Sequence, residues 1–366
     1  MYFEIEKNRL IKPLTLVTSV VEKRQTLPIL SNIYVKLENG TLTLVGTDLE
    51  VEISFSIPDV IGEDGECTVT ARKLYDICRS LPEKTAIKIK SDGVGAQIQS
   101  AKSRFKLQTL PAADFPRLDT KAWEERLKIP DASLKKLLDS TAFSMAQQDV
   151  RYFLNGVLFE VKEGRLRAVA TDGHRLAKSE VQLENGDFNL RQVIVPRKAV
   201  LEMQRFLEGT DEELTLEINP NHICLTNSNS TLITKLIDGR FPDYETVMAQ
   251  QLNVVLLQDR SELIDVLTRT AILTNEKFRG IRLNLSSNLI AVTAHNPEQE
   301  EANDEIITTY DGPEVDIGFN VNYLLEALKA LNTDMVELKL QDSNSGCTIR
   351  EPDDEETLYL VMPMRL

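Results

Sequence analysis

The chain has 366 residues, of which 42% are hydrophobic and 27% are charged. These proportions are typical of a soluble globular protein with two or three domains, and a third of the length is an ordinary domain size. The 42 Lys and Arg residues against 57 Asp and Glu residues give a net charge of −15. Taken over the whole chain, this balance argues against a nucleic-acid-binding protein, whose affinity usually comes from a basic surface.

The cysteines and the terminal residues exclude other classes. Cys67, Cys78, Cys224 and Cys347 form no C-x-x-C pair, so they predict buried thiols in a reducing compartment rather than a disulfide framework or a zinc site. The first residues lack a signal-peptide pattern, and no apolar run approaches the ~18 residues of a membrane helix. The sequence therefore indicates a cytoplasmic protein with no membrane segment, no metal and no cofactor.

The predicted elements repeat three times along the chain, in the order helix, hairpin, helix. Apolar residues at spacings of three and four predict the first helix of each copy over residues 7–21, 131–145 and 260–273. Alternating apolar residues around a turn predict hairpins over 33–48, 157–172 and 281–295, which turn at Asn39-Gly40, Glu163-Gly164 and Ser287-Asn288. The second helix of each copy is predicted over residues 71–81, 196–207 and 320–331.

The repeat has a period of about 124 residues. Ile33, Val157 and Ile281 hold the same hairpin position and are 124 residues apart in both steps. We therefore predict an α+β fold with three similar domains, each with two helices packed on antiparallel sheets: 1–125, 126–250 and 251–366. Asp131 and Asp259 are candidate helix N-caps, and the acidic segment 351–356 is predicted to be a solvated loop between two strands.

The negative charge is concentrated in the last copy. Residues 1–125 carry a net charge of −1 and residues 126–250 a net charge of −2, whereas residues 251–366 carry −12. In the first two copies the Lys and Arg residues favour the predicted helices. These helices could form a basic lining for phosphates inside an acidic protein, because the local field attracts nucleic acid. On charge alone, ordinary solvated helix faces explain the pattern equally well.

The segment T-D-G-H-R at 171–175 is the one constellation that looks catalytic. Asp172 beside His174 could orient a general base. However, no nucleophile lies at a recognised spacing, and the first copy has T-D-L-E at the same strand end. The sequence favours a turn in which the aspartate binds backbone amides.

The C-terminal V-M-P-M-R-L is apolar. A last strand packed on the third core explains Leu358 and Leu360, whereas Met362 and Met364 suit an adaptable binding surface. The sequence leaves both interpretations open.

Long segments along the chain carry recognisable motifs. They are TLPILSN (26–32), LPAADFP (110–116), FSMAQQDVRYFLNG (143–156), ATDGHRLA (170–177), GRFPDY (239–244), NEKFRG (275–280), AHNPEQEE (294–301) and the VMPMRL end. In this order and over the whole length, they resemble the bacterial sliding clamps, the family of the DNA polymerase III beta subunit. The resemblance implies three similar clamp domains per chain and two chains closed head-to-tail into a ring, with helices lining the hole and sheets at the rim.

The resemblance also implies a function and partners. A sliding clamp is a processivity factor, not an enzyme: it encircles double-stranded DNA, slides without reading the bases, and tethers the polymerase by raising its effective concentration. The implied partners are a second copy in a homodimer, double-stranded DNA, the DNA polymerase III alpha subunit, the ATP-dependent clamp loader complex, and other polymerases and repair proteins with a clamp-binding motif.

Family sites match particular residues of this chain. The DNA contacts match Arg24, Arg72, Gln148, Tyr152 and Phe153, of which Phe153 replaces a tyrosine common in the family. The groove for partner peptides matches Leu154, Thr171, Gly173, His174, Arg175, Leu176, Pro242, Val247, Leu360, Val361, Met362 and Met364. Thr246 stands where a basic residue is expected at the rim of that groove.

The dimer interface of the family joins the first domain of one chain to the third domain of the other. It matches Lys73, Arg104, Phe105, Leu107, Ile272, Leu273, Glu298, Glu300 and Glu301, with the two basic residues facing the three glutamates. Two other hypotheses stay open: an enzyme that uses Asp172 and His174, and a ring-shaped interaction hub that never loads on DNA.

Overall fold

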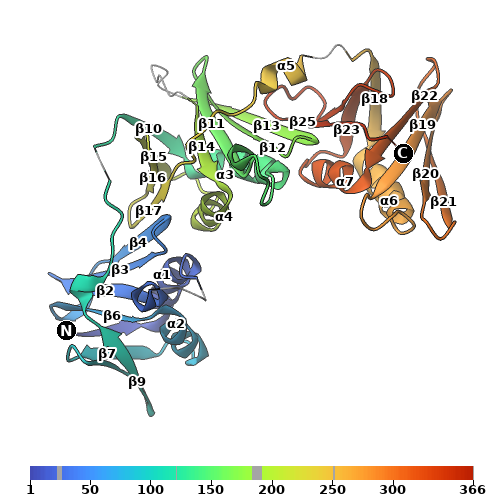
Figure 1. The fold of residues 1–366 in the computed structure, drawn as a ribbon. Helices are drawn as coiled ribbons and strands as arrows, with labels where there is room; N and C mark the ends of the chain where they lie inside the picture. Colours follow the sequence, from blue (N-terminus) through green and yellow to red (C-terminus); the bar gives the residue numbers. More distant parts are fainter. Residues whose placement is uncertain (23–26, 121, 184–191, 250–251, 366) are drawn as a thin grey trace. The chain divides into compact units, whose positions relative to one another are not determined.

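The computed structural model describes residues 1–22, 27–120, 122–183, 192–249 and 252–365. The chain forms two compact units, Met1–Lys135 with Lys198–Leu236, and Lys136–Arg197 with Ile237–Leu366. Both units combine helices with antiparallel sheets (Figure 1). The predicted α+β class is therefore confirmed.

The predicted helices are all present. They are α1 (Lys7–Ser19), α2 (Ala71–Ser80), α3 (Asp131–Thr141), α4 (Arg197–Phe206), α6 (Arg260–Ala271) and α7 (Val321–Lys329). A short helix that the sequence did not predict, α5, spans Tyr244–Met248, and 3-10 turns span Pro28–Ser31, Ala112–Asp114, Ala142–Ser144 and Tyr152–Leu154. Helix α3 ends four residues before its predicted end because the chain tightens into the 3-10 turn at Ala142–Ser144.

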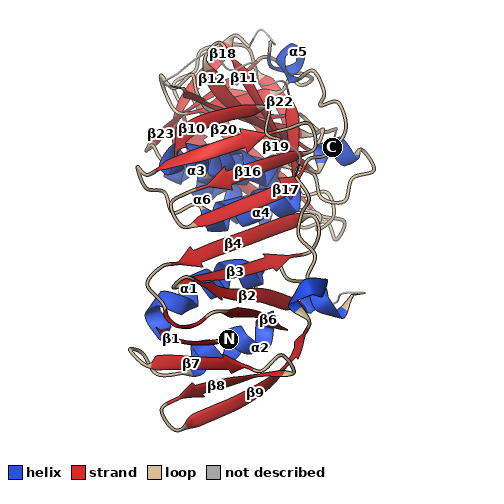
Figure 2. Ribbon diagram, turned by 90° about the vertical axis from the view of Figure 1, so that its left-hand side faces the viewer, coloured by secondary structure: helices blue, strands red, loops and turns tan. Residues whose placement is uncertain are grey.

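The strands of the first unit form one antiparallel sheet, and α1 and α2 cover one face of it (Figure 2). Its order is β10 (Glu125–Pro130), β15 (Glu213–Ile218), β16 (His222–Thr226), β17 (Ser230–Lys235), β4 (Val51–Ile57), β3 (Thr41–Thr47), β2 (Asn32–Glu38), β6 (Gly65–Thr70), β9 (Ser103–Leu110), β8 (Gly95–Ser100), β7 (Ala86–Ser91), β1 (Tyr2–Glu6) and β5 (Ile61–Glu63).

The second unit has two antiparallel sheets. The eight-stranded sheet runs β14 (Val193–Pro196), β11 (Gly156–Lys162), β12 (Arg165–Thr171), β13 (Arg175–Gln182), β25 (Leu358–Val361), β24 (Cys347–Arg350), β23 (Met335–Leu340) and β18 (Val254–Asp259). The four-stranded sheet runs β21 (Glu301–Ile307), β20 (Leu289–His295), β19 (Gly280–Ser286) and β22 (Val315–Asn320).

The strand order repeats along the chain. One block of four strands appears as β4-β3-β2-β6, β13-β12-β11-β14 and β21-β20-β19-β22, and a second block as β9-β8-β7-β1, β17-β16-β15-β10 and β25-β24-β23-β18. Where consecutive copies meet, β17 pairs with β4 and β25 pairs with β13. Both joints follow one rule. The last strand of one copy pairs with the strand that follows the predicted hairpin in the copy before it.

Local sequence explains the close packing in each copy. Asn39 and Gly40 have φ values of 49° and 75°, the left-handed conformations that a two-residue hairpin turn needs. Helix α1 packs on β3 and β4 through Leu10, Leu14 and Val17. A Cβ on Gly46 of β3 would lie 1.9 Å from the Val17 carbonyl oxygen, so only glycine allows the helix to approach this closely.

The two predicted helix caps have different outcomes. The Asp259 carboxylate accepts a hydrogen bond from the Glu262 N–H at 2.8 Å and caps α6, as predicted. The prediction for Asp131 was wrong: its buried carboxylate accepts hydrogen bonds from the backbone N–H groups of residues 208–210, because that loop lies against the start of α3. The side chain therefore ties two segments together.

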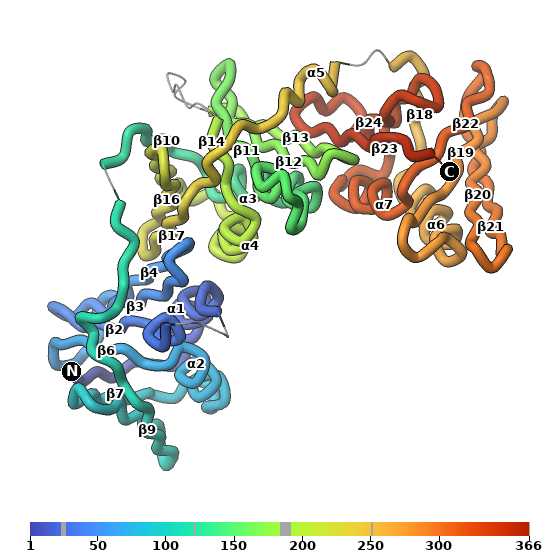
Figure 3. The backbone as a smooth tube through the Cα atoms, in the orientation of Figure 1, coloured from blue at the N-terminus to red at the C-terminus, as the bar shows by residue number. Residues whose placement is uncertain are grey.

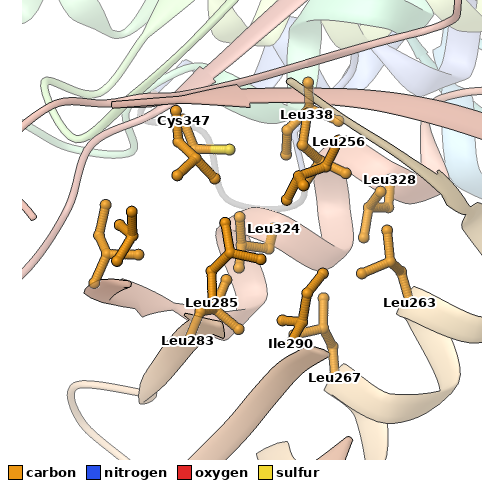
Figure 4. A pocket seen from close by; sticks show the side chains of 14 residues that line it. Leu256, Leu263, Leu267, Leu283, Leu285, Ile290, Leu324, Leu328, Leu338 and Cys347 are labelled. Atoms are coloured by element: carbon orange, nitrogen blue, oxygen red, sulfur yellow. The ribbon is translucent and has the colours of Figure 1, made fainter. Parts of the chain in front are cut away.

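The third core lies between the two sheets of the second unit and α6 and α7. Apolar side chains enclose a cavity of about 30 Å³, among them Leu263, Leu285 and Leu324 (Figure 4). Residues 351–356 join β24 to β25, as the sequence predicted. The C-terminus runs beside β22 (Figure 3), where the Met364 N–H donates to the Gly318 oxygen at 2.8 Å. None of the helices in the described ranges is long and apolar enough to cross a membrane.

Candidate DNA-contact loop and partner groove

Residues 146–155 form a loop that is closed by its own hydrogen bonds. The Ala146 N–H donates to the Leu154 oxygen at 3.0 Å. The Asn155 side chain accepts from the Asp149 N–H and donates to the Asp149 oxygen, both at 2.9 Å. These bonds hold the intervening residues in one shape without help from a sheet.

This loop carries three of the predicted DNA contacts. Gln148 is exposed and has a φ of 56°, and Tyr152 is 57% exposed. Phe153 is half-buried and packs edge-to-face against Tyr152, with ring centroids 5.8 Å apart. Gln148 and Tyr152 therefore face solvent, whereas Phe153 partly lines the apolar groove described below.

The other two predicted DNA contacts are in the first copy. Arg72 lies in the first turn of α2, exposed, with its Nε 3.5 Å from an Asp76 carboxylate oxygen. Its guanidinium also lies 5.7 Å from the Tyr75 ring centre. Together with exposed Lys73 and Arg79 it gives α2 a basic outer face. Arg24 lies outside the residues that the structure describes.

An apolar groove of about 280 Å³ opens in the second unit. Nine of the predicted groove residues line it: Leu154, Thr171, Gly173, Arg175, Leu176, Pro242, Val247, Leu360 and Met362. Its base is an apolar cluster that contains Leu158, Val169, Leu176, Phe241 and Leu360, with Met362 packed against it. These nine residues come from four separate segments of the chain, which the fold brings to one place.

Three predicted groove residues lie elsewhere. Val361 is buried in the third core, because side chains on β25 alternate between the two faces of the sheet and Leu360 takes the groove face. His174 lines a neighbouring polar cleft and stacks on Tyr323, with ring centroids 6.5 Å apart. Met364 follows the strand and is held by its backbone to β22.

Four other residues complete the groove: Arg151, Phe153, Asp243 and Tyr244. Asp243 and Tyr244 could have been recognised from an N-cap signal, because the Asp243 carboxylate accepts from the Thr246 N–H at 3.3 Å and its hydroxyl at 2.8 Å. These bonds lower the pKa of Asp243. Thr246, which replaces an expected basic residue, therefore stabilises the start of α5.

A pair of opposite charges marks the rim between the loop and the groove. Arg151 Nη2 lies 2.9 Å from Asp149 Oδ2, and this contact lowers the Asp149 pKa to about 2. The same Nη2 donates to the Asp172 backbone oxygen at 3.2 Å. Arg151 therefore connects the loop to the turn at Gly173.

Arg175 also lines the groove. Its guanidinium lies between the rings of Phe143 and Tyr323, 5.5 and 4.5 Å from their centres. It also pairs with Asp172 at 3.1 Å and with Glu326. A largely buried guanidinium with two carboxylate partners and two aromatic faces is held rigidly.

The T-D-G-H-R segment is a turn, as the sequence favoured. Asp172 Oδ1 accepts from the N–H groups of His174 and Arg175 at 2.9 and 3.0 Å. Its other oxygen accepts from Arg175 Nε, so this carboxylate is engaged by the turn. Within the described part of the chain, no three His, Cys, Asp or Glu side chains are grouped to hold a metal ion.

The predicted interface residues lie in the first and third copies, and most of them are exposed or half-buried. On β9, Phe105 and Leu107 alternate with exposed Arg104 and Lys106. Just beyond α6, Ile272 is 74% exposed and Leu273 is half-buried. Glu298, Glu300 and Glu301 are exposed at and before the start of β21, and Lys73 is exposed on α2.

Comparison with known proteins covers the whole chain. Models of the N-terminal, central and C-terminal domains of the DNA polymerase III beta subunit match residues 1–119, 128–243 and 245–365. Beta sliding clamps of Pseudomonas aeruginosa and Escherichia coli are 47% and 46% identical, with full coverage of both chains.

Solved structures agree. The sliding clamp of Pseudomonas aeruginosa bound to griselimycin has a TM-score of 0.97 and 47% identity, and Caulobacter crescentus pol III beta has a TM-score of 0.93 and 36% identity, each over the full length of both chains. The chain therefore belongs to the DNA polymerase III beta subunit family, the sliding clamps.

Proposed function

We propose that two copies of this sliding clamp close head-to-tail into a ring that encircles duplex DNA and tethers DNA polymerase III. The observation that carries the proposal is the series of three family matches in order along the chain. We place the three domains at residues 1–125, 126–250 and 251–366. The repeated strand blocks support this division, since each range holds one block of each kind, apart from Glu125, the first residue of β10.

The strand-pairing rule supports the head-to-tail closure. Inside the chain, β17 pairs with β4 and β25 pairs with β13. The same rule would pair β9 with β21. Strand β9 belongs to the first repeat and β21 to the third, so this pair would join two different chains. A β9 strand with Arg104 and Lys106 facing the β21 strand of a second copy, where Glu301 is exposed, gives opposite charges across the joint. Two such joints close a dimer with a twofold axis.

Weak contacts to phosphates suit a ring that slides. Arg72 supplies a cation on an exposed helix, and Gln148 and Tyr152 supply polar groups on a rigid loop. Contacts of this kind carry no base readout, so they allow movement along any sequence. The concentration of negative charge in residues 251–366 leaves the first two repeats nearly neutral, which removes the objection raised by the net charge.

The apolar groove suits short peptide motifs of partner proteins. Leu176, Val247, Leu360 and Met362 offer an apolar surface, and the flexible Met362 can adapt to different side chains. We assign this site to the polymerase alpha subunit, the clamp loader complex and other polymerases and repair proteins. We further infer that the chain has no catalytic activity and works in the cytoplasm, where its four free, buried cysteines would stay reduced.

Retention on circular DNA tests the function. The chain is incubated with the clamp loader complex, ATP and nicked plasmid, the mixture is gel-filtered, and half of the plasmid is then linearised. We expect the chain to stay with the circular DNA and to be lost from the linear DNA, since a ring can slide off an end. Equal retention on both forms, or none on either, would contradict a sliding ring.

The groove has a separate test. Val247→Arg places a charge in the apolar groove. It should abolish both stimulation of DNA polymerase III and loading onto the plasmid, because the polymerase and the clamp loader use this site, while sedimentation should show an unchanged dimer. An enzyme that uses Asp172 and His174 predicts instead that His174→Ala abolishes a turnover of the purified chain.

A further inference from the structure

The outermost strand of the eight-stranded sheet has a free backbone edge. Among the described residues, β18 has β23 as its one paired neighbour. The Arg260 N–H donates to the Asp334 oxygen at 2.8 Å, so even-numbered residues of β18 direct their backbone groups toward β23. Because the direction alternates in an antiparallel ladder, the N–H and C=O groups of Val255 and Leu257 point toward the free edge.

The same two residues carry exposed apolar side chains. Val255 is 50% exposed and Leu257 is 55% exposed, whereas Leu256 between them is buried in the third core. Met335, opposite Asp259 on β23, adds a third exposed apolar side chain. An edge strand with unpaired backbone groups and apolar side chains is a template for another strand.

The corresponding strands of the other two copies are protected. In the first copy, β5 pairs along the outer side of β1. In the second copy, β10 ends in Pro130 and presents Arg126 and Lys128, which bind carboxylates on β15 at 2.9 and 3.0 Å. Charged side chains and proline are the usual protections of an edge strand. Strand β18 has no proline, and its one charged residue, Asp259, lies at its last position and caps α6, so the exposed edge at Val255 and Leu257 is a particular feature of the third copy.

We propose that the β18 edge binds an extended segment of a partner protein, which adds to the sheet as an antiparallel strand. The segment has apolar side chains at alternate positions, opposite Val255 and Leu257, and basic residues at its two ends. Exposed acidic residues lie near both ends of β18, Asp342 near its start and Asp259 and Asp334 at its end. A second copy of this edge fits less well, since residues 251–366 carry a net charge of −12 and would repel their like.

The position of the edge relative to the groove supports a partner protein. Leu176 and Leu360 of the groove lie on one face of the eight-stranded sheet, opposite the face that packs into the third core. Val255 and Leu257 project from that same face, because Leu256 points into the core. A partner held in the groove would keep its neighbouring segment at high effective concentration beside β18. The β18 edge would then be occupied even if the strand pairing itself is weak. In this respect the proposal rests on the proposed function.

A model peptide tests the site directly. The probe is a fluorescein-labelled peptide of sequence KITITIK, and its control is KITPTIK, in which proline removes a backbone donor. Fluorescence anisotropy is measured with the full chain and with three variants that place a cation on an exposed or groove position: Leu257→Lys at the edge, Val94→Lys in an exposed turn of the first unit, and Val247→Arg in the groove. Hydrogen exchange of residues 253–259 is followed with and without KITITIK.

We expect saturable binding of KITITIK that is at least tenfold weaker for Leu257→Lys and unchanged for Val94→Lys and Val247→Arg. KITPTIK should bind at least tenfold more weakly, and the amides of Val255 and Leu257 should exchange more slowly with the peptide bound. The proposal is overturned if the wild-type chain does not bind KITITIK. It is equally overturned if Val247→Arg abolishes this binding and Leu257→Lys does not. It is also overturned if sedimentation shows the wild-type chain assembling beyond a dimer through this edge.

The plasmid experiment separates this proposal from the function on which it rests. Leu257→Lys should be retained on circular DNA like the wild-type chain, because the edge has no part in ring closure. Loss of plasmid retention by the wild-type chain, with peptide binding intact, would refute the ring and leave the edge site standing.

Discussion

Gly173 and Gly93 occupy the same position in two Asp-Gly turns. Both have a φ of 89°. In both turns the aspartate before the glycine accepts hydrogen bonds from the N–H groups of the two residues after the glycine. Their surroundings differ. A Cβ on Gly93 would meet nothing within 4 Å, whereas a Cβ on Gly173 would lie 3.0 Å from Arg151 Nη1.

This difference predicts the effects of two matched substitutions. Gly93→Ala should cost roughly 1–2 kcal/mol of unfolding free energy, the cost of a left-handed conformation for an L-residue. Gly173→Ala should cost more, because its methyl group also pushes the Arg151 guanidinium away by a few tenths of an ångström and strains its bonds to Asp149 and Asp172. Urea unfolding of each variant against the wild-type chain measures both costs. Equal costs would show that the Arg151 contact has no influence.

The Asp149–Arg151 pair gives a prediction about pH. Hydrogen bonds from Arg151 lower the Asp149 pKa from its ordinary value of 3.8 to about 2. Because the folded pKa is the lower one, the support that this pair gives to the loop is complete above about pH 4 and is lost as the pH falls toward 2. In Arg151→Ala the pKa should return toward 3.8, which a carbon-detected NMR titration of the carboxyl group would show. A pKa that stays near 2 would mean that another group holds the loop.

At the scale of elements, the sequence predicted what depends on local periodicity. The helices and hairpins follow from apolar spacing and from turn residues such as Asn39-Gly40, and all of them form. Pairing between copies, such as β17 with β4, was not predicted, because strand alternation does not identify a distant partner. The role of Asp131 was missed for the same reason, since its partners lie near residue 209. Nine of the twelve residues that the resemblance assigns to a partner groove line one apolar groove. Val361 does not, because adjacent residues on a strand face opposite sides of the sheet.

The cavity in the third core gives a prediction about helix α7. Leu324 is 2% exposed and lines a cavity of about 30 Å³, so the core there is already loosely packed. Leu324→Ala would enlarge the cavity and should cost about 2–5 kcal/mol, measured by urea unfolding of the second unit. The half-exposed Leu257→Ala is the control and should stay within about 0.5 kcal/mol. An unchanged midpoint for Leu324→Ala would mean that the core collapses around the smaller side chain.

At the scale of the whole molecule, the unequal distribution of charge suits a heterologous joint. The first repeat, at −1, would meet the third repeat, at −12, of a second copy. Basic residues on the first repeat, Lys73 and Arg104, would then lie opposite glutamates on the third. Such exposed pairs guide association and weaken at high salt, so the affinity of the joint must come mainly from apolar residues at its centre.

Ile272 and Leu273 are those apolar residues on the third repeat, and their replacement tests the closure of the ring. Ile272→Ala with Leu273→Ala should raise the dissociation constant of the dimer at least tenfold, or about 1.4 kcal/mol, as measured by analytical ultracentrifugation. Ile61→Ala is a matched control, because Ile61 is as exposed as Ile272 but lies on β5, away from the proposed joint. The double variant should also leave circular plasmid faster than the control, since a weaker joint opens more often. A dimer of unchanged affinity would place the joint elsewhere, and with it the pairing of β9 with β21.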